Sequence, residues 1–132
     1  MTKQILQPPG WKRPRGYANG VAAEGRLVFV AGQVGWSADA QWQTDDFGEQ
    51  FAQALRNVVA VAAEAGAAPE HIVRLTWYIT SKREYLAALK AIGAAYREIM
   101  GRHYPTMAVV EVTALVEDRA KIEIEATAVV PD

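Results

Sequence analysis

The alternation of hydrophobic and polar residues is clearest near the C-terminus of the chain. Residues 104–112 and 121–126 both alternate with a period of two, which is typical of β-strands. The polar segment Glu117–Arg119 between them favours a tight connection, so we expect the two strands to pair antiparallel. Because Glu123 and Glu125 share one face of the second strand, we expect a sheet with one apolar face and one face that mixes aliphatic side chains with carboxylates.

Three further strands are predicted upstream by the same kind of pattern. Residues 17–22 and 27–31 are the first two, and Glu24-Gly25 between them is a hairpin signal. A third strand is expected over residues 72–80, where apolar side chains again alternate with polar ones.

Two amphipathic helices separate these strands. The first begins after Asp46, which can cap it with Glu49 as reciprocal partner, and Gly66 suits a left-handed C-terminal cap. Its apolar stripe is expected to be core and consists of Phe47, Phe51, Leu55, Val58 and Ala62. The second helix begins at a Ser81–Glu84 capping box and ends at Gly101.

The element order β-β-α-β-α-β-β predicts an α+β fold, with a single mixed β-sheet and two helices on one face. Residues 1–16, rich in proline, glycine and basic groups, are expected to form an extended N-terminal arm before a single domain over residues 17–132. The second sheet face would be left uncovered by the chain, and such a large apolar patch predicts self-association.

The composition says little about the fold but excludes several kinds of chemistry. The net charge of −1 gives no electrostatic reason to expect nucleic-acid binding. The absence of cysteine excludes a disulfide or thiolate nucleophile, and His71 and His103 are far apart in sequence, so we expect no metal and no cofactor. No segment resembles a signal peptide or membrane span, so a cytoplasmic protein is expected.

Three segments together resemble the RidA/YjgF (Rid) family. They are Tyr17–Gly20 with Gly32-Gln33, the helical Asn57-Val58, and the C-terminal motif that begins at Tyr104-Pro105 and continues through Lys121–Ala126. The resemblance implies a chorismate-mutase-like subunit and a homotrimer with three small-molecule clefts between subunits. The family's best-known activity is hydrolysis of reactive imines and enamines, such as 2-aminoacrylate, to keto acids and ammonia.

Several positions depart from the family pattern. Deaminating members carry an arginine two residues after the proline of the motif, where it clamps the substrate carboxylate, and this chain has Met107 there. A family cysteine is Val109, a serine before Gly32 is Ala31, and a helical asparagine aligns with Gly93. A thioether offers only apolar, adaptable contact, so the pocket should not hold a small amino-acid-derived imine in the usual way.

Two other positions match the family's tyrosine and its water-positioning glutamate. Tyr17 is expected to line the cleft, and Glu123 is the candidate that directs water to the C=N carbon. The alternative for Glu123 is a rim carboxylate hydrogen-bonded across the interface, and Glu111 is a weaker catalytic candidate. We expect Met107 and Glu123 to flank the same crevices between subunits.

A flatter or more apolar ligand would suit a pocket with a methionine in place of the arginine. Trp36, after the Gly35 turn, is the better candidate to line it, whereas Trp77 alternates with core positions of its strand. Three residues could supply a substitute cation: Arg15, Arg102 and His103.

Three functions therefore remain open from the sequence. One is a Rid-type hydrolase acting on an imine or enamine other than the usual substrate. Another is a trimer that sequesters an apolar or aromatic metabolite without turnover. The labels ribonuclease and translation inhibitor, which some relatives carry, are disfavoured by the neutral net charge and by the lack of a basic-aromatic stripe.

Overall fold

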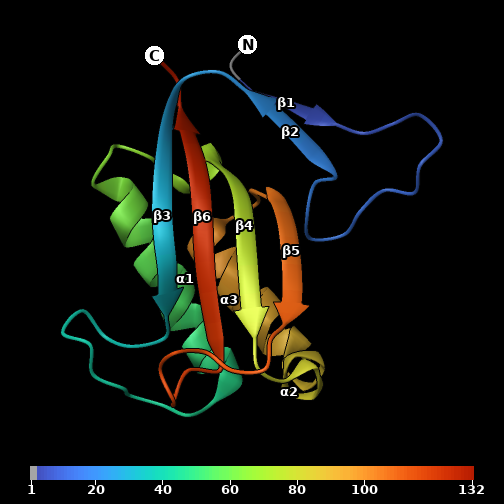
Figure 1. The fold of residues 1–132 in the computed structure, drawn as a ribbon. Coiled ribbons are helices and arrows are strands. Elements are labelled where there is room, and N and C mark those ends of the chain that lie inside the picture. The colour runs from blue at the N-terminus through green and yellow to red at the C-terminus, as the bar shows by residue number, and fades with distance from the viewer. Residues whose placement is uncertain (1–2) are drawn as a thin grey trace.

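A four-stranded mixed sheet forms one layer of the protein and the helices form a second layer on one of its faces (Figure 1). The computed structural model describes residues 3–132. The sheet order is β3-β6-β4-β5, and the strands are β3 (Arg26–Val34), β4 (Ile72–Ile79), β5 (Thr106–Glu111) and β6 (Ile122–Val130). The expected α+β class, with a mixed sheet covered on one face, is confirmed.

The predicted antiparallel pairing of the two C-terminal strands is wrong. β5 pairs parallel with β4 at the edge of the sheet, while β6 runs antiparallel between β3 and β4. The chain between β4 and β5 forms helices, and a helical crossover returns the chain in the same direction, which makes the two strands parallel. Residues 112–121 are therefore a loop that passes the end of β4 rather than a hairpin turn.

The hairpin expected at Glu24-Gly25 is also not formed. The strand β2 (Gly20–Ala23) pairs antiparallel with β1 (Lys3–Leu6) in a separate two-stranded sheet. Gly25 has a φ of +146° and lies against the backbone of Val130, so the chain changes direction there and passes from the small sheet into β3. The N-terminal arm thus contains a strand, and its first two residues lie outside the described residues.

The helical layer consists of α1 (Phe47–Ala63), α2 (Lys82–Ala87) and α3 (Leu89–Met100), with a short 3-10 turn, η1 (Pro69–His71), before β4. What the sequence suggested as one second helix is divided at Ala88, whose φ and ψ of −101° and 6° are not helical. No helix within residues 3–132 has the length and apolar character needed to cross a bilayer.

The predicted N-cap hydrogen bonds of α1 and α2 are present, but the glutamates do not return a hydrogen bond to the N-cap residues. The Asp46 carboxylate accepts from the Glu49 backbone N–H at 3.0 Å, while the Glu49 carboxylate accepts from the Thr44 hydroxyl. Ser81 accepts from the Glu84 N–H in the same way. At the other end of α1, Gly66 adopts the expected left-handed conformation with φ +78°.

The core lies between α1, α3 and the helix-facing side of the sheet. All five apolar residues predicted along α1 are buried, as are Ile122 and Ile124 of β6. The polar Gln50 is fully buried among them, where its side-chain amide bonds to three backbone groups of two loops. These contacts join the loop before α1 to the loop before β6.

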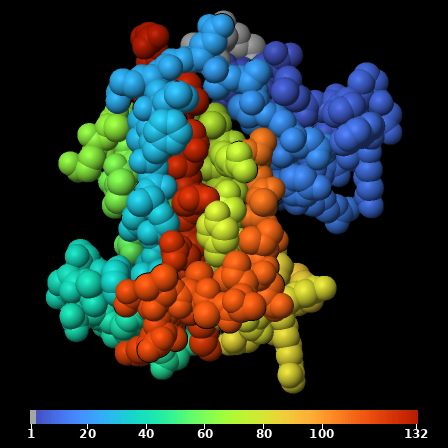
Figure 2. All heavy atoms as spheres, viewed as in Figure 1, coloured from blue at the N-terminus to red at the C-terminus, as the bar shows by residue number. Residues whose placement is uncertain are grey.

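The opposite face of the sheet has no helix over it (Figure 2). Phe29, Leu27 and Val110 expose 73%, 59% and 43% of their surface there. Among them lie Glu123 and Glu125, which alternate with the buried isoleucines of β6. This helix-free face therefore mixes apolar side chains with carboxylates, as the alternation predicts.

Candidate functional site

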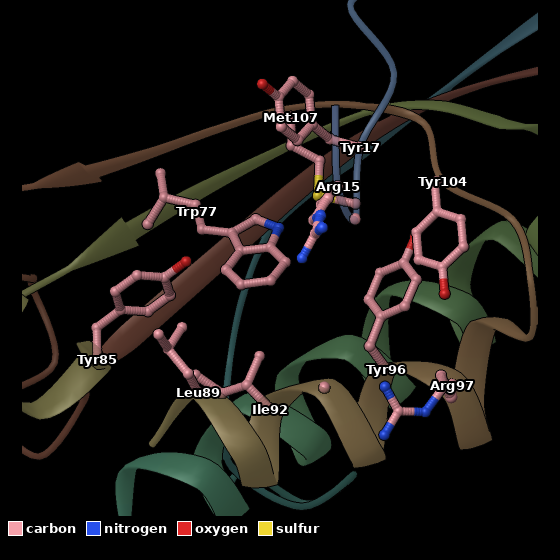
Figure 3. Close-up of a pocket in the computed structure, with 13 residues that line it drawn as sticks. Arg15, Tyr17, Trp77, Tyr85, Leu89, Ile92, Tyr96, Arg97, Tyr104 and Met107 are labelled. Carbon is pink, nitrogen blue, oxygen red and sulfur yellow. The ribbon is translucent and has the colours of Figure 1, made fainter. Parts of the chain in front are cut away.

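A pocket of about 550 Å³ lies on the helix side of the sheet, between edge strand β5 and helix α3 (Figure 3). Its volume is in the range of small-molecule sites. The residues that line it come from the N-terminal segment, β4, α2, α3, the loop after α3, and β5: Arg15, Gly16, Tyr17, Trp77, Tyr85, Leu89, Ile92, Gly93, Tyr96, Arg97, Tyr104, Met107 and Val109.

The arm is attached to the rim of this pocket by backbone contacts. The Ala18 N–H donates to the Pro105 carbonyl at 3.0 Å, and Ala18 forms an isolated parallel bridge with Thr106. Because Ala18 is fixed at the start of β5, Arg15 and Tyr17 lie beside Met107 in the pocket (Figure 3).

Two aromatic pairs form opposite sides of the pocket (Figure 3). Trp77 and Tyr85 meet edge to face with ring centroids 6.4 Å apart, and Trp77 also contacts Phe51 of the core at 4.8 Å. On the other side Tyr96 and Tyr104 stack at 5.3 Å with an interplanar angle of 12°. A planar apolar group would find aromatic contacts on both sides.

The indole N–H of Trp77 has no hydrogen-bond partner. The side chain is only 4% exposed, and its Nε1 is the one buried side-chain nitrogen or oxygen without a partner in the part of the chain that the structure describes. In Figure 3 this nitrogen points toward the part of the pocket where Arg15 and Met107 lie. Buried donors in folded proteins nearly always have a partner, so this one suggests an acceptor that the chain itself does not supply.

The charged groups of the pocket are all cationic. Arg15 and Arg97 line it, and no aspartate or glutamate among residues 3–132 does. Burial raises the pKa of Tyr96, whose hydroxyl donates to the His103 carbonyl, and burial also raises the pKa of Tyr85, so both side chains stay neutral at ordinary pH. The pocket therefore presents neutral aromatic walls and two positive charges.

Four residues singled out from the sequence come together in this pocket. Tyr17, Gly93, Met107 and Val109 are distant in the chain but all line it. A Cβ at Gly93 would meet only the Arg97 guanidinium, at 3.4 Å. Of the three cation candidates, Arg15 lines the pocket.

Three other predicted residues form a second cluster on the helix-free face. A register shift between Val30 and Gln33 interrupts the pairing of β3 with β6 at Ala31-Gly32. The Glu123 carboxylate lies directly over this bulge, since a Cβ on Gly32 would stand 1.9 Å from its Oε2. β-bulges are common beside functional sites because they redirect the backbone.

Within one subunit Met107 and Glu123 lie on opposite faces of the sheet, so a crevice flanked by both, as expected between subunits, requires two copies of the chain. Met107 pairs with Leu75 of β4 and packs against the core, whereas Glu123 pairs with Tyr78 on the opposite face. The sequence assigned the two faces of each strand correctly. It did not reveal which strands pair, and the pairing decides which face of β5 lies on the same side of the sheet as a given face of β6.

The remaining candidates lie elsewhere. Trp36 packs against Trp42 with ring centroids 5.5 Å apart, outside the pocket. Glu111 accepts from the Lys82 N–H at 2.6 Å at the start of α2. Arg102 lines a neighbouring groove along the N-terminal arm, and the His103 side chain does not line the pocket. Among residues 3–132, no group of three or more acidic or histidine side chains is placed to hold a metal ion.

The sequence analysis did not identify Tyr85, Tyr96 and Arg97 as pocket residues. The sequence did contain a signal for a pocket. Gly93 and Arg97 are four residues apart, so they lie on one face of α3, where a small and a basic residue interrupt an otherwise apolar stripe.

Comparisons with known proteins agree with this fold. The chain matches the family model described as endoribonuclease L-PSP over residues 12–130. A RutC family protein of Synechocystis is 32% identical over 136 aligned residues, covering 99% of each chain. The 2-iminobutanoate/2-iminopropanoate deaminase of Dermatophagoides farinae is 25% identical, covering 97% of each chain.

The similarity extends to solved structures. The crystal structure of YyfB from Yersinia pestis, a Rid family protein of unknown function, superimposes with a TM-score of 0.85 at 31% identity, covering 98% of this chain and 100% of that one. A family match over almost the whole chain, together with full-length relatives above 30% identity, shows that this protein belongs to the RidA/YjgF (Rid) family.

Proposed function

We propose that the protein is a homotrimeric Rid-type hydrolase that acts on an imine or enamine in the pocket between β5 and α3. The observation that carries the proposal is the convergence of Tyr17, Gly93, Met107 and Val109 on one pocket of suitable volume. These are positions at which the family resemblance places the substrate site, and one relative is named as an imine deaminase.

The reaction adds water to the carbon of the C=N bond and then expels ammonia to leave a carbonyl compound. It requires a group that removes a proton from water and returns it to the leaving nitrogen. In a single subunit, no carboxylate of the described part of the chain lines the pocket. In the proposed trimer, the exposed apolar side chains of the helix-free face become buried against neighbouring copies, and the Glu123 carboxylate of one copy reaches the pocket of the next.

The absence of an acidic residue from the pocket also favours a second function. If assembly does not bring Glu123 to a neighbouring pocket, the protein binds an apolar or aromatic metabolite without turning it over. Met107 in place of an arginine is compatible with both functions, because it changes the ligand rather than the handling of water.

An ammonia-release assay distinguishes the two functions. Imines are generated in situ from a panel of small and aromatic amino acids and offered to the wild type, to Glu123→Gln and to Met107→Arg. We expect release from aromatic imines by the wild type, loss of that release in Glu123→Gln, and a shift toward small imines in Met107→Arg. Wild-type release at the background rate with every imine would refute the hydrolase.

A further inference from the structure

We propose that the pocket takes a planar aromatic ligand with a carboxylate, whose anionic group is held by Arg15 on the N-terminal arm and the Trp77 indole N–H. This inference rests on the pocket being the small-molecule site proposed above. It places the binding of the carboxylate at Arg15, outside the C-terminal motif, and specifies aromatic acids as the ligands of the pocket.

The charge balance of the pocket argues for an anionic ligand. Within one subunit, Arg15 and Arg97 are the only charged residues among 3–132 that line it. The two ion pairs formed within residues 3–132 join Arg119 to Asp45 and Lys121 to Glu84, so no carboxylate of the described chain neutralises either pocket arginine. Two unpaired guanidinium groups beside a partly enclosed apolar surface attract an anion, and a guanidinium matches a carboxylate in shape.

The unpaired indole N–H locates the anion within the pocket. Trp77 Nε1 is buried and lacks an acceptor, and it points toward the side on which Arg15 enters (Figure 3). A carboxylate oxygen there would accept from both the indole and the guanidinium. Arg97 lies across the pocket, folded over Gly93, so it supplies a second positive charge at a distance from the indole.

The walls of the pocket argue for an aromatic ring on that ligand. Trp77 and Tyr85 form one side and the stacked pair Tyr96–Tyr104 forms the other. The Met107 thioether contributes a polarisable surface to the lining, which adapts to a flat ring. A small aliphatic acid would leave most of this aromatic surface without contact.

The binding test compares an acid with its amide of nearly equal shape. The wild-type protein is titrated by calorimetry with trans-cinnamate and trans-cinnamamide, and then with 2-naphthoate and 2-naphthamide. We expect each acid to bind about 10-fold more tightly than its amide, because a charge-assisted hydrogen bond is roughly twice as strong as a neutral one. Arg15→Gln should remove this preference, and the exposed Arg56→Gln on α1, outside the pocket, should preserve it.

A spectroscopic measurement tests the indole contact separately. In the ¹⁵N-labelled protein, the Trp77 side-chain resonance is the one absent from Trp77→Phe, and cinnamate should move it downfield while leaving the Trp11 resonance in place. Equal affinity for acid and amide, or a preference unchanged in Arg15→Gln, would overturn the inference and leave the proposed hydrolase standing, since ammonia release is measured independently. Binding of neither compound would also overturn it.

Discussion

The buried Gln50 offers a quantitative test of the fold because its partners are known. Its Nε2 donates to the Thr44 and Arg119 carbonyls at 3.1 and 3.0 Å, and its Oε1 accepts from the Lys121 N–H at 2.8 Å. Gln50→Met keeps the approximate side-chain length but leaves all three backbone groups without a partner. At about 1 kcal/mol or more for each group, the variant should lose roughly 3 kcal/mol of unfolding free energy.

Urea unfolding followed by circular dichroism measures this loss, at one fixed protein concentration because self-association adds to apparent stability. The matched control is Gln53→Met in the same helix, where a single bond to Asn57 at 2.8 Å is lost and about 1 kcal/mol is expected. A loss in Gln50→Met no larger than that in the control would refute the assignment of Gln50 as the link between the two loops.

Three further predictions follow from other parts of the molecule. Burial raises the pKa of Tyr96, so the native state keeps the phenol proton at a pH where the unfolded chain has lost it. The contribution of Tyr96 to stability is therefore full below about pH 10 and falls as the pH rises further. Melting temperatures measured from pH 8 to 11 should fall less steeply in Tyr96→Phe than in the wild type. Gly93→Ala should raise stability by about 0.5–1 kcal/mol in urea unfolding, because the added methyl meets only the end of the Arg97 side chain, at 3.4 Å. Gly35→Ala should prevent folding, because its Cβ would lie 2.5 Å from the Gln50 carbonyl. In the proposed trimer, Phe29→Asp should reduce the mass measured by light scattering from three subunits of 14.4 kDa to one, while Val116→Asp on a loop should leave it unchanged. An unchanged mass in Phe29→Asp would contradict burial of the helix-free face.

Much of the local structure could be predicted because periodicity reports directly on which residues are buried. The helical spacing of the α1 stripe and the alternation of Ile122 and Ile124 with glutamates both correspond to the observed burial. The pairing of strands could not be deduced from alternation, which assigns faces but not neighbours. A helical segment between β4 and β5 was the better guide, since a helical crossover joins parallel strands.

The site was harder to predict because one side chain can serve both the core and the pocket. Trp77 packs its ring on Phe51 and presents its N–H toward the pocket, so its alternation with core positions was correct and still hid its second role. Trp36 followed a glycine turn and suggested a ligand contact, but it packs on Trp42. Sequence spacing also could not show that Arg15 lies beside Met107, because the arm is brought there by the Ala18 contact with β5.

The most direct test of the ligand site is a crystal structure of the protein grown with trans-cinnamate. We expect density for the ring between the Trp77–Tyr85 and Tyr96–Tyr104 pairs, with the carboxylate within hydrogen-bond distance of Trp77 Nε1. Density only on the helix-free face beside Glu123, or an empty pocket at a saturating concentration, would contradict the location of the site.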